Sequence, residues 1–286
     1  MMTRTKCAVF IGLVFAISWS ALIGSWLSGH RTLADGGLLT LVYVAGPGLS
    51  AIFCAAVFER GRRIDALGLR FRPNVWWLWA ILIPLFVTLA SIAITSLLSP
   101  HRFATMDAMA IELARTLGHP IDGALPALGG VLALGLLQNA ILCSLTEELG
   151  WRGYLYDLLR PYGFWRTALG TGLVWGVWHW PMIYLYGLNY PNNPIAGLVV
   201  FPFYTMLSAC LLTVVRDRSG SVWPAGIMHG ATNTFALLFL LALGDLGWPW
   251  GAAGIGGLLA LGLAVAAFRV SQHFIQDRTI GSPFPP

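Results

Sequence analysis

Apolar stretches long enough to cross a membrane recur along the entire chain, and short polar segments separate them. A bilayer hydrocarbon core is about 30 Å thick, so an α-helix needs roughly 20 mostly apolar residues to cross it. The pattern predicts eight such helices, at residues 7–28, 38–58, 75–98, 127–159, 167–187, 197–215, 223–243 and 251–268. We therefore expect an all-α, polytopic helix bundle that forms a single integral membrane domain over residues 1–286.

Two of the segments need a separate interpretation. The stretch 127–159 would be about 50 Å long as a straight helix. We expect it to tilt, to break near Gly129 and Gly130, or to project from the membrane. The outer loop 99–125 contains Asp107–Leu117, which could form a short helix in the membrane interface, but a simple connector is the preferred interpretation.

The composition excludes an ordinary soluble domain, because 57% of the residues are hydrophobic and only 10% are charged. Of the 17 Lys and Arg residues, thirteen fall in the connectors of one side, and Arg152 lies within a predicted span. The other side has Arg31, Arg102 and Arg115. This bias predicts that both termini are cytoplasmic. The expected location is a bacterial-type cell (inner) membrane. The bias also explains the basic pI of about 9.3 without a nucleic-acid partner.

Several polar residues lie in predicted spans that have no structural need of them. They are Glu147, Glu148 and Arg152 in the fourth span, His179 in the fifth, and His229 and Asn233 in the seventh. A charged residue at the centre of a membrane helix costs about 2.5–3.5 kcal/mol on insertion scales, so such residues are candidates for a functional site.

Counting along the helices places three of these groups at a similar depth. Glu147 and His179 each lie thirteen residues from the nearest cytoplasmic arginine, and His229 lies eleven. At about 1.5 Å per residue the first two are about 20 Å from that boundary, and the third is somewhat nearer. We therefore expect the three side chains to converge on one site.

Helical spacing divides the roles of the two glutamates. Glu148 and Arg152 are four residues apart and can form a charge-assisted pair on one helix face. Glu147 points about 100° away, so we interpret it as the working carboxylate and the Glu148–Arg152 pair as a structural clamp. The alternative is that both glutamates serve the arginine. His229 and Asn233 are also four apart and share a face.

A carboxylate and two imidazoles can activate water, with Glu147 as the base. His229 and Asn233 can donate hydrogen bonds to the oxyanion of a tetrahedral intermediate, so the set favours peptide hydrolysis without a covalent intermediate. Cys143, one turn before Glu147, remains an alternative nucleophile. Glu147, His179 and His229 could instead ligate zinc, so the cofactor is either none or one zinc ion.

Three short motifs, in this order, resemble the CAAX-protease and bacteriocin-processing (CPBP or Abi) family of intramembrane proteases. They are Glu147-Glu148-Leu149-Gly150-Trp151-Arg152, Trp175-Gly176-Val177-Trp178-His179 and His229-Gly230-Ala231-Thr232-Asn233. Trp175 replaces the more usual phenylalanine. The resemblance implies an eight-helix bundle with its protease core at about 125–245. It also implies that Glu147 and His179 activate water and that His229 and Asn233 stabilise the oxyanion. The "metalloprotease" label of the family leaves the metal open.

The resemblance implies membrane lipid and a peptide or protein substrate as partners. Eukaryotic members of the family, the type II CAAX prenyl endopeptidases, remove the last three residues of prenylated proteins, so the substrate could be processed at its C-terminus. Some bacterial members are linked to bacteriocin immunity or peptide-signal maturation. Two other functions stay open, a proton- or ion-coupled transporter and a non-catalytic membrane scaffold. Paired broken helices in inverted repeats would favour transport, and the sequence contains no such pairing that we recognise.

Overall fold

The computed structural model describes residues 3–100, 103–118, 120–121, 123–244 and 246–280, with the backbone only for residue 116 and residues 270–280. Within these ranges the chain is helical and contains no strand. The predicted all-α membrane bundle is thereby confirmed. Arg102 and the two chain ends, whose side of the membrane was predicted, lie outside the described residues, and the topology stays a prediction.

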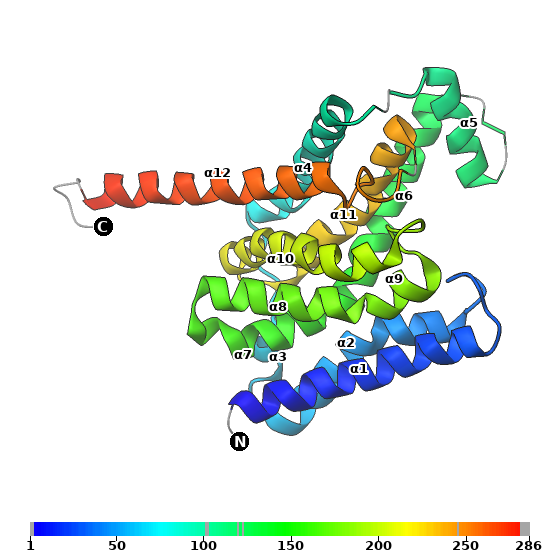
Figure 1. The fold of residues 1–286 in the computed structure, drawn as a ribbon. Coiled ribbons are helices and arrows are strands. Elements are labelled where there is room, and N and C mark those ends of the chain that lie inside the picture. Colours follow the sequence, from blue (N-terminus) through cyan, green and yellow to red (C-terminus); the bar gives the residue numbers. More distant parts are fainter. Residues whose placement is uncertain (1–2, 101–102, 119, 122, 245, 281–286) are drawn as a thin grey trace.

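The helices follow one another with short connections. In chain order they are α1 (Thr3–Leu27), α2 (Leu38–Phe58), α3 (Arg63–Ala66), α4 (Trp76–Leu98), α5 (Met106–Leu117), α6 (Ala124–Cys143), η1 (Ser144–Leu155), α7 (Tyr156–Leu159), η2 (Arg160–Tyr162), α8 (Phe164–Trp178), α9 (Trp180–Tyr186), α10 (Pro194–Ser219), α11 (Val222–Leu243) and α12 (Ile255–Ile280). Figure 1 shows α1 beside α2 and α8 beside α10, with α12 crossing near α4 and extending from the bundle.

By length and composition, six helical segments of the described chain could cross a membrane. They are Thr3–Leu27, Leu38–Phe58, Trp76–Leu98, the run Ala124–Tyr162, Pro194–Ser219 and Val222–Leu243. The predicted span 167–187 is divided between α8 and α9, which are each too short for this criterion. The predicted span 251–268 corresponds to the shorter apolar part of α12, Ile255–Arg269. The number eight is therefore not confirmed.

The long fourth segment deviates from a regular helix, but not at the glycine pair. Helix α6 continues through Gly129 and Gly130, where an added Cβ atom would meet no described atom within 4 Å. The change comes at Ser144, where η1 begins as a π-helix. The hydroxyls of Ser144 and Thr146 donate to carbonyls four residues earlier, at 2.6 and 2.7 Å, and such bonds compete with the regular backbone ladder. A π-helical turn is often found at functional sites.

Glycines allow η1 to lie directly against α2. A Cβ atom on Gly48 would be 2.6 Å from the carbonyl oxygen of Thr146, and one on Gly150 would be 2.9 Å from that of Pro47. Small residues are the usual means by which membrane helices approach so closely. This contact fixes the part of η1 that carries the two glutamates.

The outer loop contains a helix, so the preferred interpretation of this loop as a simple connector was wrong. Helix α5 begins after Thr105, whose hydroxyl accepts a hydrogen bond from the backbone N–H of Ala108 at 3.2 Å, and it ends at Gly118 with a φ of +73°. The Thr105 cap is a local start signal and the left-handed Gly118 a local stop signal. Helix α5 packs against α6 and α11.

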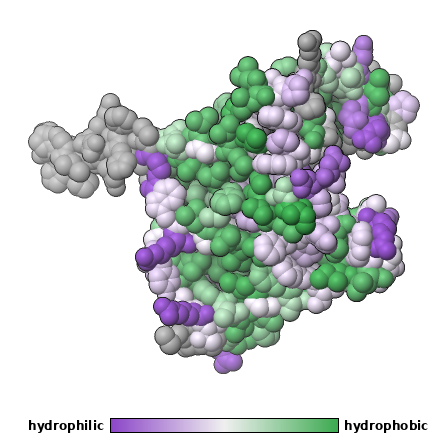
Figure 2. All heavy atoms as spheres, in the orientation of Figure 1, coloured by the Kyte–Doolittle hydropathy of each residue, from purple (hydrophilic) through white to green (hydrophobic). Residues whose placement is uncertain are grey.

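Many of the basic side chains gather at one end of the bundle, where polar atoms edge an apolar surface in Figure 2. Nζ of Lys6 lies 2.6 Å from Oε1 of Glu59, and Arg62 joins Glu59 to Asp157 at 2.8 and 2.6 Å. The ion pairs therefore connect α1, the end of α2 and α7. We refer to this end, which also carries Arg4, Arg63, Arg166, Arg218 and Arg269, as the arginine-rich end.

Candidate active site

Four of the predicted site residues line the same cavity, which has a volume of about 380 Å³. Glu147 comes from η1, His179 from the junction of α8 and α9, and His229 and Asn233 from α11. Most of the remaining wall is apolar or aromatic. Elements that are far apart in sequence thus bring a carboxylate, two imidazoles and an amide to one largely apolar space.

The indole of Trp175 joins these groups. Its Nε1 donates a hydrogen bond to Oε2 of Glu147 at 2.8 Å. Its ring centroid lies 5.8 Å from that of His179 and 4.9 Å from that of His229. The guanidinium carbon of Arg152 lies 4.9 Å from the indole centroid. Sequence reasoning placed Trp175 in a motif but missed this role. Its position one helical turn before His179 was the available signal.

His179 sits where the helix changes course between α8 and α9. Pro181 lacks a backbone N–H and suits the first turn of a new helix, so the break follows from the local sequence. Nδ1 of His179 lies 2.9 Å from the backbone oxygen of Trp175. Because a carbonyl oxygen only accepts, Nδ1 carries the proton in this contact, and Nε2 of a neutral ring holds the free lone pair.

The predicted pair of Glu148 and Arg152 is present, with 3.1 Å between Oε1 and Nη1 and both side chains completely buried. The same Oε1 also lies 2.9 Å from Nδ1 of His229. Glu147 makes its hydrogen bond to Trp175 instead. The sequence carried no signal for the Glu148–His229 contact, since the two residues are 81 positions apart on different helices.

The clamp leaves polar atoms without partners. Oε2 of Glu148 and both Nε and Nη2 of Arg152 are buried and make no hydrogen bond to any described residue. Each such atom costs about 1–3 kcal/mol. The backbone oxygen of Arg152 is tied to α10 by a 2.9 Å hydrogen bond from Nε of Arg216. Costly buried charges inside a membrane bundle are typical of a functional site.

Asn233 is exposed, whereas His229, one turn earlier, is buried. Nδ2 of Asn233 donates to Sγ of Cys143 at 3.6 Å, which is a weak contact. On the next turn Nδ2 of Asn139 donates to the hydroxyl of Thr234 at 3.0 Å. These contacts fix α11 against the end of α6.

The predicted zinc ligands do not form a ready metal site. Among the described residues, no group of three or more His, Cys, Asp or Glu side chains is arranged to hold a metal ion. Nδ1 of His179 and Nδ1 of His229 have hydrogen-bond partners within the protein, which leaves Nε2 of each ring as the free nitrogen. Because the side chains of Glu147, His179 and His229 are not grouped as a ligand set, the mechanism below uses only side chains and water.

Residues 129–235 match the family model described as "Type II CAAX prenyl endopeptidase Rce1-like". This range contains the four cavity residues and the clamp. This segment is therefore similar to the CPBP family. Together with its apolar helices, this match identifies the chain as an integral membrane protein.

The chain is also similar to a curated relative, CAAX prenyl protease 2 of Methanococcus maripaludis. The two are 34% identical over 109 residues, an alignment that covers 27% of this chain and 40% of the relative. The chain thus aligns with less than half of the relative's length.

Proposed function

We propose that this chain is an intramembrane endopeptidase that hydrolyses a peptide bond with water activated by Glu147 and His179. The observation that carries the proposal is that Glu147, His179, His229 and Asn233 line one cavity while the clamp lies outside its lining. Amide hydrolysis without a covalent intermediate requires a base, a hydrogen-bond acceptor that orients the water, and two hydrogen-bond donors to the oxyanion.

The first step is attack by water. The indole N–H of Trp175 donates a hydrogen bond to Oε2 of Glu147, which leaves Oε1 to take a proton from a water molecule. Nε2 of His179 accepts the other hydrogen bond of that water and orients it. The water oxygen forms a bond to the carbonyl carbon, and the π electrons of the carbonyl move to its oxygen.

The second requirement is stabilisation of the resulting oxyanion. His229 donates from Nδ1 to the Glu148 carboxylate, so a donor at Nε2 requires the doubly protonated ring. The negative charge of Glu148 favours that form. Asn233 supplies a second donor, because its present partner is the weakly accepting sulfur of Cys143.

Collapse of the intermediate completes the reaction. The oxyanion electrons re-form the carbonyl, the bond from carbon to nitrogen breaks, and the proton held by Glu147 passes to the leaving amine. Glu147 regains its negative charge, and no bond to the enzyme forms at any step. Glu148 and Arg152 act as positioning residues, since Glu148 orients His229 and Arg152 packs on Trp175.

The substrate that fits best is the C-terminal part of a membrane-associated protein or peptide. The mostly apolar wall of the cavity favours a hydrophobic segment. The name of the relative, CAAX prenyl protease 2, supports processing near a C-terminus. Whether the substrate is prenylated is a separate question that the assay below addresses.

A cleavage assay tests the proposal. Purified protein in lipid nanodiscs is incubated with tagged C-terminal peptides, prenylated and unmodified, and the products are identified by mass spectrometry. We expect cleavage by the wild type and by Cys143→Ala, and a rate lower by about 10²- to 10⁴-fold for Glu147→Gln. Absence of cleavage across the library would favour a transporter or scaffold. Loss of cleavage in Cys143→Ala, with an acyl-enzyme trapped on the wild type, would contradict the water mechanism.

A further inference from the structure

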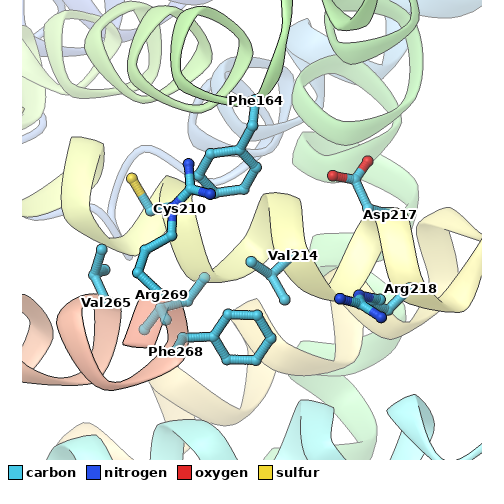
Figure 3. Close-up of a pocket in the computed structure, with 9 residues that line it drawn as sticks. Phe164, Cys210, Val214, Asp217, Arg218, Val265, Phe268 and Arg269 are labelled. Atoms are coloured by element: carbon cyan, nitrogen blue, oxygen red, sulfur yellow. The ribbon is translucent and has the colours of Figure 1, made fainter. Parts of the chain in front are cut away.

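A second cavity, of about 190 Å³, lies at the arginine-rich end between the start of α8, the end of α10 and α12 (Figure 3). Leu211 contributes to its wall and to that of the active-site cavity. The proposed reaction uses none of the charged groups at this place. We propose that this cavity binds the headgroup of an anionic phospholipid.

The apolar part of the cavity suits the upper part of a lipid. Its wall includes Cys210, Val214, Val265 and Phe268, which come from α10 and α12. These side chains offer no charge to a ligand, so the region can receive a glycerol backbone and the first methylene groups of an acyl chain. A free inorganic phosphate would gain nothing from this wall.

Arg269 supplies a cation that the protein holds in place. Its guanidinium carbon lies 4.5 Å from the ring centroid of Phe164 and 4.3 Å from that of Trp165. Its Nε is buried and makes no hydrogen bond to any described residue. Figure 3 shows the guanidinium directed toward Phe164 within the cavity. The side chain is therefore stacked on aromatic rings and forms no ion pair among the described residues.

Arg218 supplies a second cation on α10. It is exposed, lines the same cavity and forms no ion pair with the residues that the structure describes. The carboxylate in the lining, Asp217, accepts a hydrogen bond from the hydroxyl of Tyr156, and Figure 3 shows it apart from Arg269. The cavity lining holds two arginines, Arg218 and Arg269, and one carboxylate, Asp217, so its net charge is positive. A positive site of this kind suits a phosphate group.

The surroundings place this cation pair at the depth of lipid headgroups. Trp165, which contacts Arg269 of the cavity wall, is 46% exposed, and such aromatic residues concentrate at the membrane–water interface. Arg269 already occupies faces of the neighbouring Phe164 and Trp165 rings, so these are poor partners for a choline group. Basic pockets between membrane helices are known to bind anionic headgroups. These observations favour an anionic lipid over phosphatidylcholine.

Lipid selectivity is measured with the full chain in vesicles, using spin-labelled phosphatidylglycerol and spin-labelled phosphatidylcholine. We expect the wild type to retain more immobilised phosphatidylglycerol than phosphatidylcholine. The variant Arg218→Gln/Arg269→Gln should lose this preference, by about fivefold for each arginine. The control, Arg4→Gln/Arg63→Gln, removes two exposed charges at the same end outside the cavity and should keep the wild-type preference.

Two further measurements separate the alternatives. Val265→Phe narrows the cavity without changing a charge, so it should also reduce the preference in protein whose melting temperature matches the wild type. Glycerol phosphate and inorganic phosphate at millimolar concentration should not displace the labelled lipid. An unchanged preference in the arginine variant, equal losses in the control, or displacement by free phosphate would each overturn the proposal.

Discussion

Nδ1 of His229 lies 2.9 Å from Oε1 of Glu148, the same carboxylate oxygen that pairs with Arg152. The contact joins α11 to η1 through a completely buried acid. The Glu148–Arg152 pair therefore has a second role, because it also orients the imidazole of His229 in the candidate active-site cavity. Removing Glu148 should therefore affect both the stability of the bundle and the chemistry proposed for His229.

The first prediction concerns this shared carboxylate. Glu148→Gln leaves Arg152 without a charge partner in the interior, and losing one member of a buried pair costs about 3–5 kcal/mol. We expect a lower melting temperature in detergent and a loss of cleavage. Arg152→Met should reproduce much of the stability loss. The double variant should be more stable than Glu148→Gln, because neither charge is left unpaired, although cleavage need not return.

Glu147→Gln should behave differently. Glutamine keeps the size of the side chain and an oxygen that can accept the hydrogen bond from Trp175, so the melting temperature should stay close to the wild type. Loss of the base should reduce kcat by about 10²- to 10⁴-fold. The measurement is peptide cleavage beside thermal unfolding. An early-melting Glu147→Gln combined with a stable Glu148→Gln would mean that the two roles are reversed.

The third prediction tests the close approach of α2 to η1. Gly48→Ala places a methyl group 2.6 Å from the carbonyl oxygen of Thr146, next to Glu147. The helices must separate, at a cost of about 1–3 kcal/mol. Gly12→Ala is the control, since the described structure leaves open space there. We expect lower stability and lower activity only for Gly48→Ala. Equal melting temperatures for both variants would show that α2 does not constrain η1.

The fourth prediction concerns acid sensitivity at the arginine-rich end. Burial raises the pKa of the Glu59 carboxyl, but the hydrogen bonds and charges of Lys6 and Arg62 outweigh it, so the pKa lies below its ordinary value of 4.5. The unfolded chain therefore binds this proton more tightly. The stabilisation by Glu59 is complete above about pH 4.5 and is lost as the pH falls through the lower folded pKa.

Melting temperatures of the wild type and Glu59→Gln, measured from pH 7 to pH 3, check this prediction. We expect Glu59→Gln to be less stable at pH 7 and to lose less stability on acidification, so that the two curves approach each other at low pH. Parallel curves over the whole range would show that this ion-pair group contributes nothing to the acid response.

The fifth prediction concerns metal. Because the described residues do not assemble a ligand set, we expect purified active protein to contain less than one zinc ion per chain and to keep its activity with a strong chelator. Metal content by mass spectrometry and cleavage before and after chelation provide the check. Stoichiometric zinc that follows activity through removal and restoration would contradict the mechanism proposed here.

The amino-acid sequence by itself determined those features that depend on neighbours along the chain. Apolar runs of about 20 residues must be helical in a membrane, because every backbone polar group needs a partner within its own segment. This reasoning located the six segments that are long enough to span, although it also predicted a span at 167–187 that is divided between α8 and α9. The Glu148–Arg152 pair could be predicted for the same reason, since positions four apart on a helix are neighbours whatever surrounds them.

Only the tertiary structure decided which groups meet across helices. The hydrogen bond from Trp175 to Glu147 and the contact of His229 with Glu148 join residues 28 and 81 positions apart, and no local periodicity encodes such distances. The close packing of η1 on α2 at Gly48 and Gly150 was equally hidden, because it joins two helices that are far apart in sequence. Side-chain packing between helices, rather than the hydrophobic pattern, fixes these contacts and with them the geometry of the site.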